Sequence, residues 1–302
     1  MTRARSDWRG YLFIAPATIY LLVFSFVPMV IAAYLSLHRW HLLKEDHPFV
    51  GAGNYVELFR NPFFRNAVWN TAVFAALSVP LGMVFALAVA VLVNQKLRGV
   101  AVFRTLYYIP AVSSGVALSM VWIWILLPQD GLINYVLRCF GYPGDYDFLN
   151  VPAPGHFLPA PAMLCLVAMS AWIGLGPRMV IFLAGLQGIP DSLYESAEID
   201  GCNGWQRFRY ITLPLLMPTT FFVLITSTIA AFQLFTQVYV MTRGGPQRAT
   251  DVVVYHIYRE AWHRLQIGMA SAQSYVLFGI ILLIAIVQFA LMRRRVEDAG
   301  EW

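Results

Sequence analysis

Charged residues are scarce in this chain of 302 residues, which is 59% hydrophobic and only 12% charged. Soluble domains carry about a quarter charged residues, so most of the surface of this protein is expected to face lipid. Lysine is almost absent, because only Lys44 and Lys96 occur and neither follows a GxxxxG run. The chain therefore lacks the phosphate-binding loop of a P-loop ATPase and cannot hydrolyse ATP by that route.

Cysteine is also scarce. Cys139, Cys165 and Cys202 fall in different segments and form no CxxC pair, so neither a disulfide framework nor a cysteine metal cluster is predicted. His38 and His41 lie three residues apart with acidic residues nearby, but a solvated loop explains them better than a metal site does. We therefore predict no metal site.

The chain is basic, with a formal net charge of +5. Its basic residues lie at the ends of apolar runs, where the positive-inside rule puts them, so we expect a membrane lipid environment and no nucleic-acid partner. Arg3, Arg5 and Arg9 precede an apolar run from Tyr11 to Tyr34. That run is longer than the apolar region of a signal peptide, about 7 to 15 residues, and long enough for a bilayer crossing of about 20.

Six apolar segments can each cross a bilayer. They occupy residues 11–34, 71–93, 102–127, 161–186, 215–241 and 271–292. Residues 54–64 are expected to form an amphipathic helix that anchors the chain at the membrane interface, and residues 128–160 an outer loop. Because Arg293 to Arg295 close the last segment, both termini are expected in the cytoplasm. Without repeats or linkers, residues 1–302 are predicted to form a single all-α transmembrane domain with six helices.

A polar stretch from Gln187 to Pro218 separates two of these segments and predicts a helix, a turn and a second helix. Pro190 marks the start of the first helix. Gly201 and Gly204 interrupt the stretch. An apolar stripe with a spacing of three residues then predicts the second helix, which Pro214 ends: Trp205, Phe208 and Ile211.

Four residues of the first helix carry its pattern. Ser192 and Glu195 have the spacing of a capping box. Ala197 and Gly201 lie four residues apart, which places them on one nearly bare helix face. Another protein could approach such a face closely.

This stretch resembles the EAA loop in the membrane subunits of binding-protein-dependent ABC importers. That motif reads Glu-Ala-Ala, three residues, Gly, nine residues, then Ile-x-Leu-Pro. Here Glu195-Ser196-Ala197, Gly201 and Ile211-Thr212-Leu213-Pro214 match it without a gap, and only Ser196 departs from it. The resemblance covers nearly the whole chain and implies a type I importer permease fold.

The resemblance also implies how residues 187–214 act. In that family this coupling loop docks into a cleft of a cytoplasmic ATP-binding subunit dimer, which holds the ATP and Mg²⁺. The residues expected to couple that dimer to this chain are Glu195, Ala197, Asp200 and Gly201. No cofactor is expected in the chain itself. The alternative is that Glu195 only caps its own helix and that the loop is a solvated connector.

Polar and kinked positions within the spans are candidates for a solute pathway. Two glycines before Pro177 weaken the fourth span and free backbone groups that line a cavity or find new partners. In the fifth span, Gln233 and Gln237 lie four apart on one face of a continuous helix. The residues assigned to the pathway are Ser170, Trp172, Gly174, Ser227, Ala231, Gln233 and Gln237.

The chemistry of this lining favours a carbohydrate, because amides, hydroxyls and aromatic faces without fixed charge suit sugar hydroxyls and rings. The alternative is that these side chains only hold helix to helix. The resemblance is greatest to the carbohydrate class, which includes the first membrane subunits of maltose and glycerol-phosphate importers. It implies sugar contacts at Ser170, Ile173, Gly174, Pro177, Ser227, Ala230, Ala231 and Leu234. Several of these are apolar here where that family has amides or a tyrosine, which leaves the solute open.

Together these observations predict a permease subunit of an ATP-driven ABC importer in a prokaryotic cell membrane, without an ATPase site of its own. Its expected partners are a second permease subunit in a heterodimer, an ATP-binding subunit dimer and an extracytoplasmic solute-binding protein. The alternative solute is a glycerophosphodiester or glycerol 3-phosphate, whose phosphate Arg243 or Arg248 could meet. A secondary transporter is less favoured, because Arg178 is the only charged residue away from the ends of the spans, and no acid–base pair suggests an intramembrane enzyme.

Overall fold

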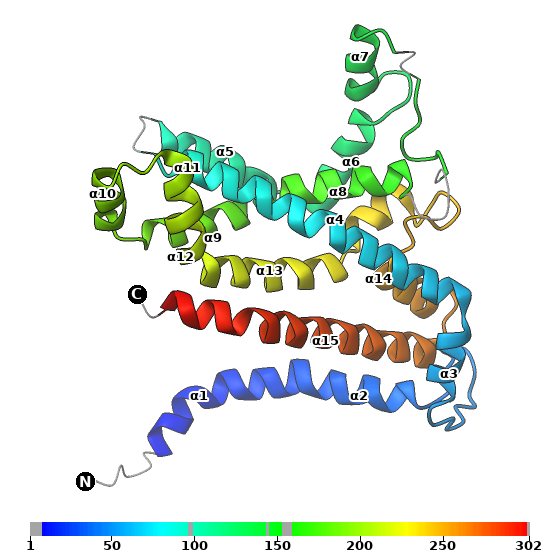
Figure 1. The fold of residues 1–302 in the computed structure, drawn as a ribbon. Coiled ribbons are helices and arrows are strands. Elements are labelled where there is room, and N and C mark those ends of the chain that lie inside the picture. Colours follow the sequence, from blue (N-terminus) through cyan, green and yellow to red (C-terminus); the bar gives the residue numbers. More distant parts are fainter. Residues whose placement is uncertain (1–7, 96–98, 143–144, 153–158, 301–302) are drawn as a thin grey trace. The chain divides into compact units, whose positions relative to one another are not determined.

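The computed structural model describes residues 8–95, 99–142, 145–152 and 159–300 (Figure 1). Within these residues the regular elements are helices, and the only strand-like pairings are two isolated bridges, from His38 to Phe49 and from His41 to Gln266. The predicted all-α class is therefore confirmed. The chain divides into two compact units, formed by residues 1–62 with 257–278 and by residues 63–256 with 279–302.

The first unit is built on the N-terminal span, which is predicted correctly. It runs as a helix of 26 residues from Tyr11 to Ser36, formed by α1 (Trp8–Leu21), the π-helical segment η1 (Leu22–Phe26) and α2 (Val27–Ser36). The side chain of Asn54 donates hydrogen bonds to the carbonyls of Ser36 (2.7 Å) and His38 (2.9 Å). It thereby satisfies backbone groups that the end of α2 leaves without helical partners.

The predicted amphipathic helix over residues 54–64 is shorter than expected. It forms α3 (Gly53–Arg60), and Asn61 then separates it from the next helix. Leu58 is buried in α3, whereas Val56 and Phe59 are exposed. The remaining helical parts of this unit are η4 (Arg259–His263) and the first turns of α15 (Ile267–Gly300).

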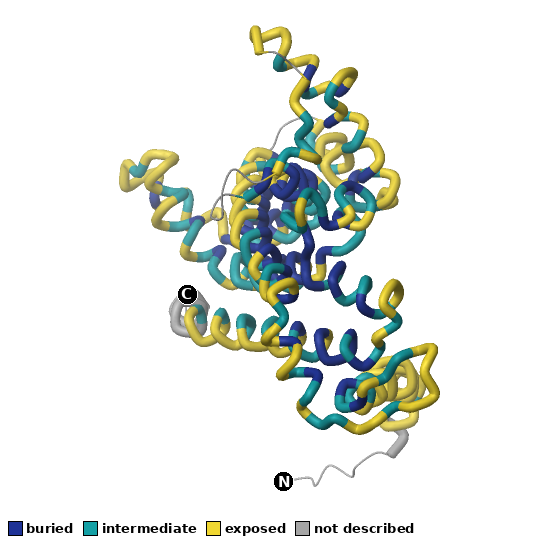
Figure 2. The backbone as a smooth tube through the Cα atoms, turned by 90° about the vertical axis from the view of Figure 1, so that its right-hand side faces the viewer, coloured by how far each residue is buried: buried dark blue, intermediate teal, exposed yellow. Residues whose placement is uncertain are grey.

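The second unit holds most of the core. Its helices include α4 (Pro62–Val93), α5 (Val100–Val112), α6 (Gly115–Ile125), α7 (Leu132–Cys139), α8 (Pro161–Ile173), α9 (Leu175–Gln187), α13 (Met217–Phe232), η3 (Val238–Thr242) and α14 (Val253–Tyr258). A buried apolar cluster joins α4, α9 and α13 through residues such as Ala86, Phe182 and Val223. Figure 2 marks the buried residues in dark blue. Small residues on α4 permit close packing of this kind in membrane helices.

Three helices in the described residues are long and apolar enough to cross a membrane: Tyr11–Ser36, Pro62–Val93 and Ile267–Met292. Three further spans appear only if each of three bent helix pairs counts as one span, which gives up to six. The pairs bend by 99° between α5 and α6, by 47° between α8 and α9, and by 65° before α13. The second span begins at Pro62 rather than at residue 71, because α4 continues through the preceding residues.

The third span is not the continuous helix that residues 102–127 predict. Ser113 and Ser114 adopt extended backbone conformations (ψ 156° and 123°), which end α5 and start α6. Pro110 lies near the end of α5 and removes one helical hydrogen bond there. As a result α6 leaves the direction of α5 (Figure 1).

The fifth span is also interrupted. Helix α13 ends at Phe232. Residues 233–235 are not helical, and helical structure resumes at residue 236. The prediction that Gln233 and Gln237 share one face of a continuous helix is therefore wrong. Interrupted backbone at membrane depth is tolerated where it lines a cavity or is buried in protein, so the break keeps this region among the candidates for a pathway.

Candidate functional site

The polar stretch forms the predicted helical hairpin. Its first arm is α10 (Asp191–Ile199), and its second arm comprises α11 (Gly204–Arg207), the π-helical segment η2 (Phe208–Thr212) and α12 (Leu213–Leu215). Gly201 closes α10 in a left-handed conformation with φ of +77°. The amide of Gly201 donates to the carbonyl of Glu198 (3.1 Å) and that of Cys202 to the carbonyl of Ala197 (2.9 Å). This pair of bonds is the Schellman motif, which requires a residue such as glycine at this position.

The predicted capping box at Ser192 and Glu195 is wrong. Pro190 has an extended backbone (φ −59°, ψ 130°) and is itself the N-cap, so α10 begins at Asp191 and Ser192 lies inside it. The capping box occurs instead at the second arm. There the Asn203 side chain accepts from the Gln206 amide (2.9 Å), and the Gln206 side chain accepts from the Asn203 amide (2.8 Å).

The predicted bare face of α10 is only partly open. Ala197 is 8% exposed and is the buried residue of this helix, so it packs within the chain rather than facing a partner. Glu195 and Asp200 are exposed, and a Cβ atom added at Gly201 would meet nothing within 4 Å. Of the four residues predicted to couple this chain to a partner, Glu195, Asp200 and Gly201 are therefore exposed and Ala197 is not.

Three large apolar residues on the hairpin are exposed. Ile199 is 87% exposed and Tyr210 is 74% exposed, and neither was singled out from the sequence. Trp205, which belongs to the predicted apolar stripe, is 70% exposed. Apolar side chains left open on a polar hairpin are typical of an interaction surface. The exposure of Ile199 could have been predicted from the sequence, because Ile199 lies between two acidic residues and does not belong to the apolar stripe of the second helix.

The two arms of the hairpin are tied together. The hydroxyls of Tyr194 and Thr212 lie 2.9 Å apart, and Arg207 pairs with Glu198 at 3.3 Å. The Tyr194 side chain also lines a pocket of about 500 Å³, together with Asn94, Gln95, Val100, Ala101, Arg104, Leu186, Gln187, Ile189 and Asp191. Side-chain contacts therefore join α10 directly to the second arm of the hairpin.

The predicted weak point of the fourth span lies at Gly174, where α8 gives way to α9 with a bend of 47°. One helical turn later, the Nε atom of Arg178 donates to the Ser227 hydroxyl on α13 at 2.9 Å. The guanidinium lies so close to Gly174 that a Cβ atom added at Gly174 would come within 2.6 Å of the Nη1 nitrogen of Arg178. Arg178 thus brings together two predicted pathway residues, Gly174 and Ser227.

The other predicted pathway residues lie in separate surroundings. The Ser170 hydroxyl is buried and has no hydrogen-bond partner within the described part of the chain. Trp172 is 42% exposed, with its ring centre 6.1 Å from that of Trp122. Ala231 is buried, while Gln233 lies in the break after α13 and Gln237 follows that break.

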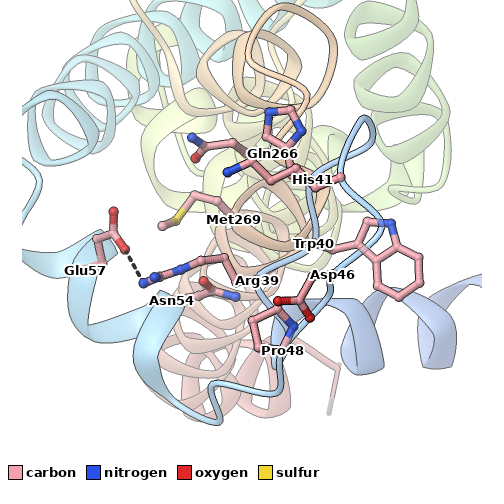
Figure 3. A pocket seen from close by; sticks show the side chains of 10 residues that line it. Arg39, Trp40, His41, Asp46, Pro48, Asn54, Glu57, Gln266 and Met269 are labelled. Carbon is pink, nitrogen blue, oxygen red and sulfur yellow. Dashed lines mark ion pairs between the residues drawn. The ribbon is translucent and has the colours of Figure 1, made fainter.

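A second pocket, in the first unit, was treated from the sequence as a solvated loop. It has a volume of about 430 Å³ and mixes both signs of charge (Figure 3), with a lining of Arg39, Trp40, His41, Lys44, Asp46, Pro48, Asn54, Glu57, Gln266 and Met269. Arg39 and Glu57 form an ion pair across it at 3.6 Å. In the described residues, no group of three or more His, Cys, Asp or Glu side chains could hold a metal ion.

Comparison with known proteins gives concordant matches. Residues 78–297 match the family model of binding-protein-dependent transport system inner membrane components. The chain is 34% identical over 288 residues to the sn-glycerol-3-phosphate transport system permease protein UgpA of Agrobacterium fabrum, covering 95% of both chains. It is 35% identical to the protein of the same name from Rhizobium meliloti, again over 95% of both chains.

Solved structures give the same fold. A chain of a bacterial ABC transporter involved in the import of the acidic polysaccharide alginate is 25% identical, with a TM-score of 0.81 over 95% of this chain and 96% of that one. Together, the family match, the relatives and the shared fold place this chain among the inner membrane components of binding-protein-dependent transport systems, as a permease subunit of an ABC importer.

Proposed function

We propose that this chain forms half of a transmembrane path for a carbohydrate of the oligosaccharide type, in an importer driven by ATP hydrolysis on partner subunits. The observation that carries this proposal is the hairpin of residues 187–218, with its exposed Glu195 and Ile199 at the helix end closed by Gly201. A connector between two spans needs neither a rigid turn nor open apolar side chains. An ATP-binding subunit that grips the hairpin explains both.

Coupling would pass through α10. The ATP-binding subunits hold ATP and Mg²⁺, and their closure would push α10 on the cytoplasmic side of the membrane. The Tyr194–Thr212 contact would pass that movement to η2, which leads into α13. The spans would then change from an inward-open to an outward-open arrangement, with the bends at Gly174 and before α13 as points of flexure.

The orientation in this proposal places both termini and the hairpin in the cytoplasm. A second permease subunit completes the path, and an extracytoplasmic solute-binding protein delivers the solute to the outer loops. A solved alginate transporter in complex with an alginate-bound periplasmic protein has the same fold as this chain. That precedent supports delivery by such a protein here.

A second candidate solute is a glycerophosphodiester or glycerol 3-phosphate, because the relatives described above are named for sn-glycerol 3-phosphate transport. Of the two outer arginines expected to meet its phosphate, Arg248 is occupied. Its guanidinium lies 3.7 Å from the ring centre of Phe63 and 4.0 Å from the Asp251 carboxylate. Arg243 remains exposed.

Uptake by the reconstituted importer tests the solute class. Proteoliposomes that contain this chain, its partner permease, the ATP-binding subunits and the solute-binding protein would be supplied with labelled maltotriose, labelled trigalacturonate or labelled sn-glycerol 3-phosphate. We expect ATP-dependent uptake that oligosaccharides compete away. Competition by phosphodiesters alone would refute the carbohydrate assignment, and an absence of ATP-dependent uptake of either solute would refute the proposed function itself.

Charge reversal at Glu195 tests the coupling role. We expect Glu195→Lys to leave the subunit in the membrane at normal levels but to abolish the stimulation of ATP hydrolysis by solute-loaded binding protein. Glu45→Lys is a matched reversal at an exposed residue outside the hairpin, and it should leave stimulation unchanged. Full stimulation in Glu195→Lys would contradict the role.

A further inference from the structure

Arg178 carries the positive charge at the bend between α8 and α9. It lies on α9 one turn after Gly174, and its side chain is half-buried. Its Nε atom donates to the Ser227 hydroxyl, but its Nη1 nitrogen is buried and has no hydrogen-bond partner in the described part of the chain. A guanidinium has five N–H donors and no acceptor, so it needs acceptors from elsewhere.

This chain does not provide a counter-charge for Arg178 within its apolar segments. None of the six predicted spans contains an Asp or Glu residue. A charged side chain within a membrane is costly, and it generally faces a cavity or a partner and marks a functional pathway. An anion that pairs with Arg178 would therefore come from outside these spans.

The surroundings of Arg178 are shaped to hold its guanidinium. A side chain added at Gly82 on α4 or at Gly174 would clash with the Nη1 nitrogen and displace it. Ser227 fixes the orientation of the head group from α13. One turn before Gly174 lies Ser170, whose buried hydroxyl also lacks a partner in the described residues.

We propose that Arg178 is a specificity-determining residue that binds a phosphate or carboxylate of the transported solute at the bend between α8 and α9. This inference rests on the proposed function, since it places Arg178 on the solute path. A guanidinium binds either anion through two parallel hydrogen bonds. Uncharged polar side chains would then bind the hydroxyls of the same solute, so the carbohydrate carried would be one that bears an anionic group.

The competing source of an anion is a carboxylate of the second permease subunit. In that case Arg178 would hold the two membrane subunits together and would not discriminate between solutes. The two possibilities differ in what loss of the charge does: it changes either the preference between charged and uncharged solutes or the assembly of the membrane subunits.

Direct binding to the whole membrane complex separates these cases. The complex of both permease subunits and the ATP-binding subunits, in lipid nanodiscs, would be titrated with two matched pairs of probes. One pair is sn-glycerol 3-phosphate with glycerol, and the other is galacturonate with galactose. Tryptophan fluorescence reports binding, because Trp172 lies near the end of α8 at this bend and its ring centre lies 6.1 Å from that of Trp122.

We expect one anion to bind roughly ten- to a hundredfold more tightly than its uncharged counterpart, the range expected for a charge-assisted hydrogen-bond pair. The pair that shows the preference identifies phosphate or carboxylate as the group recognised. Arg178→Gln should abolish the preference. Arg65→Gln, which removes an exposed charge on α4, should retain it.

Equal binding of charged and uncharged probes, or no binding of either anion, would overturn the proposal even if ATP-driven uptake of another solute is intact. An unchanged preference in Arg178→Gln would also overturn it, and weaker assembly of the membrane subunits alongside that result would point to a carboxylate of the partner. If Arg178→Gln does not assemble, Arg178→Lys decides. It keeps the charge but loses the planar fork, so a fully retained preference would refute the proposed bidentate contact.

Discussion

Gly201 closes α10 with φ of +77°, and a side chain at this position would meet no other atom within 4 Å. Any effect of Gly201→Ala is therefore conformational, and a left-handed conformation costs an ordinary residue about 1–2 kcal/mol. We predict that Gly201→Ala loosens the turn and reduces the stimulation of ATP hydrolysis by solute at least several-fold, while the subunit stays in the membrane. An ATPase assay of the reconstituted complex measures this effect.

Gly204 offers the matched control for that experiment. It also has open space around it, but it begins α11 with no positive φ. Gly204→Ala should therefore leave stimulation intact, and Gly201→Asn should be intermediate, because asparagine tolerates the left-handed region. Equal effects of Gly201→Ala and Gly204→Ala would show that the turn geometry is not what coupling requires.

The residues of the hairpin could be predicted from the sequence only in part. The spacing from Glu195 to Gly201 and Pro214 was sufficient to find the hairpin, because a turn glycine and a helix-ending proline act locally. The orientation of α10 was not predictable in the same way. Ala197 is buried and Ile199 exposed because the second arm covers one side of the helix, and no local spacing encodes that contact.

The contact between α5 and α9 shows how one position fixes the distance between two elements. A Cβ atom at Gly176 would lie 2.5 Å from the carbonyl oxygen of Tyr107 and 2.8 Å from the Cα atom of Tyr108. Both are backbone atoms that cannot rotate away. We predict that Gly176→Ala forces the helices apart and destabilises the subunit by about 1–3 kcal/mol, as overpacking does.

Thermal unfolding of the purified membrane complex measures this change, with an expected fall in the midpoint of a few degrees. Gly279→Ala is the appropriate comparison, because Gly279 lies inside α15 and a Cβ atom there meets nothing within 4 Å. That substitution should be neutral or slightly stabilising, since alanine is the better helix former. A fall of the same size in both variants would show that helix propensity, not the α5–α9 contact, is responsible.

At the scale of helices, hydropathy located the apolar segments but not their bends. The 47° bend at Gly174 had a local cause in two glycines and a proline, so the sequence indicated it. The 99° bend had a weaker signal, because Ser113 and Ser114 are compatible with a helix and adopt extended conformations here. The candidate pathway could likewise be predicted only in part. Gly174 and Ser227 were expected along the path, whereas the position of Arg178 between them is known only from its hydrogen bond, which joins α9 to α13.

For the whole molecule, six crossings follow only if each bent pair crosses the membrane once. In that arrangement α7 and the hairpin of residues 187–218 are separated by a single crossing, formed by α8 and α9. They must then lie on opposite sides of the membrane. If the pair α8–α9 were re-entrant instead, both would lie on the same side, and an ATP-binding subunit and a solute-binding protein could not both reach their expected surfaces.

The three cysteines of this chain lie in α7, in the crossing pair α8–α9 and in the hairpin, so their reactivity tests this arrangement. Cys139 is exposed at the end of α7, Cys202 is partly exposed in the hairpin turn, and Cys165 is buried in α8. We predict that a membrane-impermeant maleimide labels Cys139 from the outside of intact cells and Cys202 only in inverted vesicles, with Cys139→Ser and Cys202→Ser identifying each signal. Cys165 should react only after denaturation. Labelling of Cys139 and Cys202 from the same side would contradict the crossing by α8 and α9, and with it the placement of the hairpin against an ATP-binding subunit in the cytoplasm.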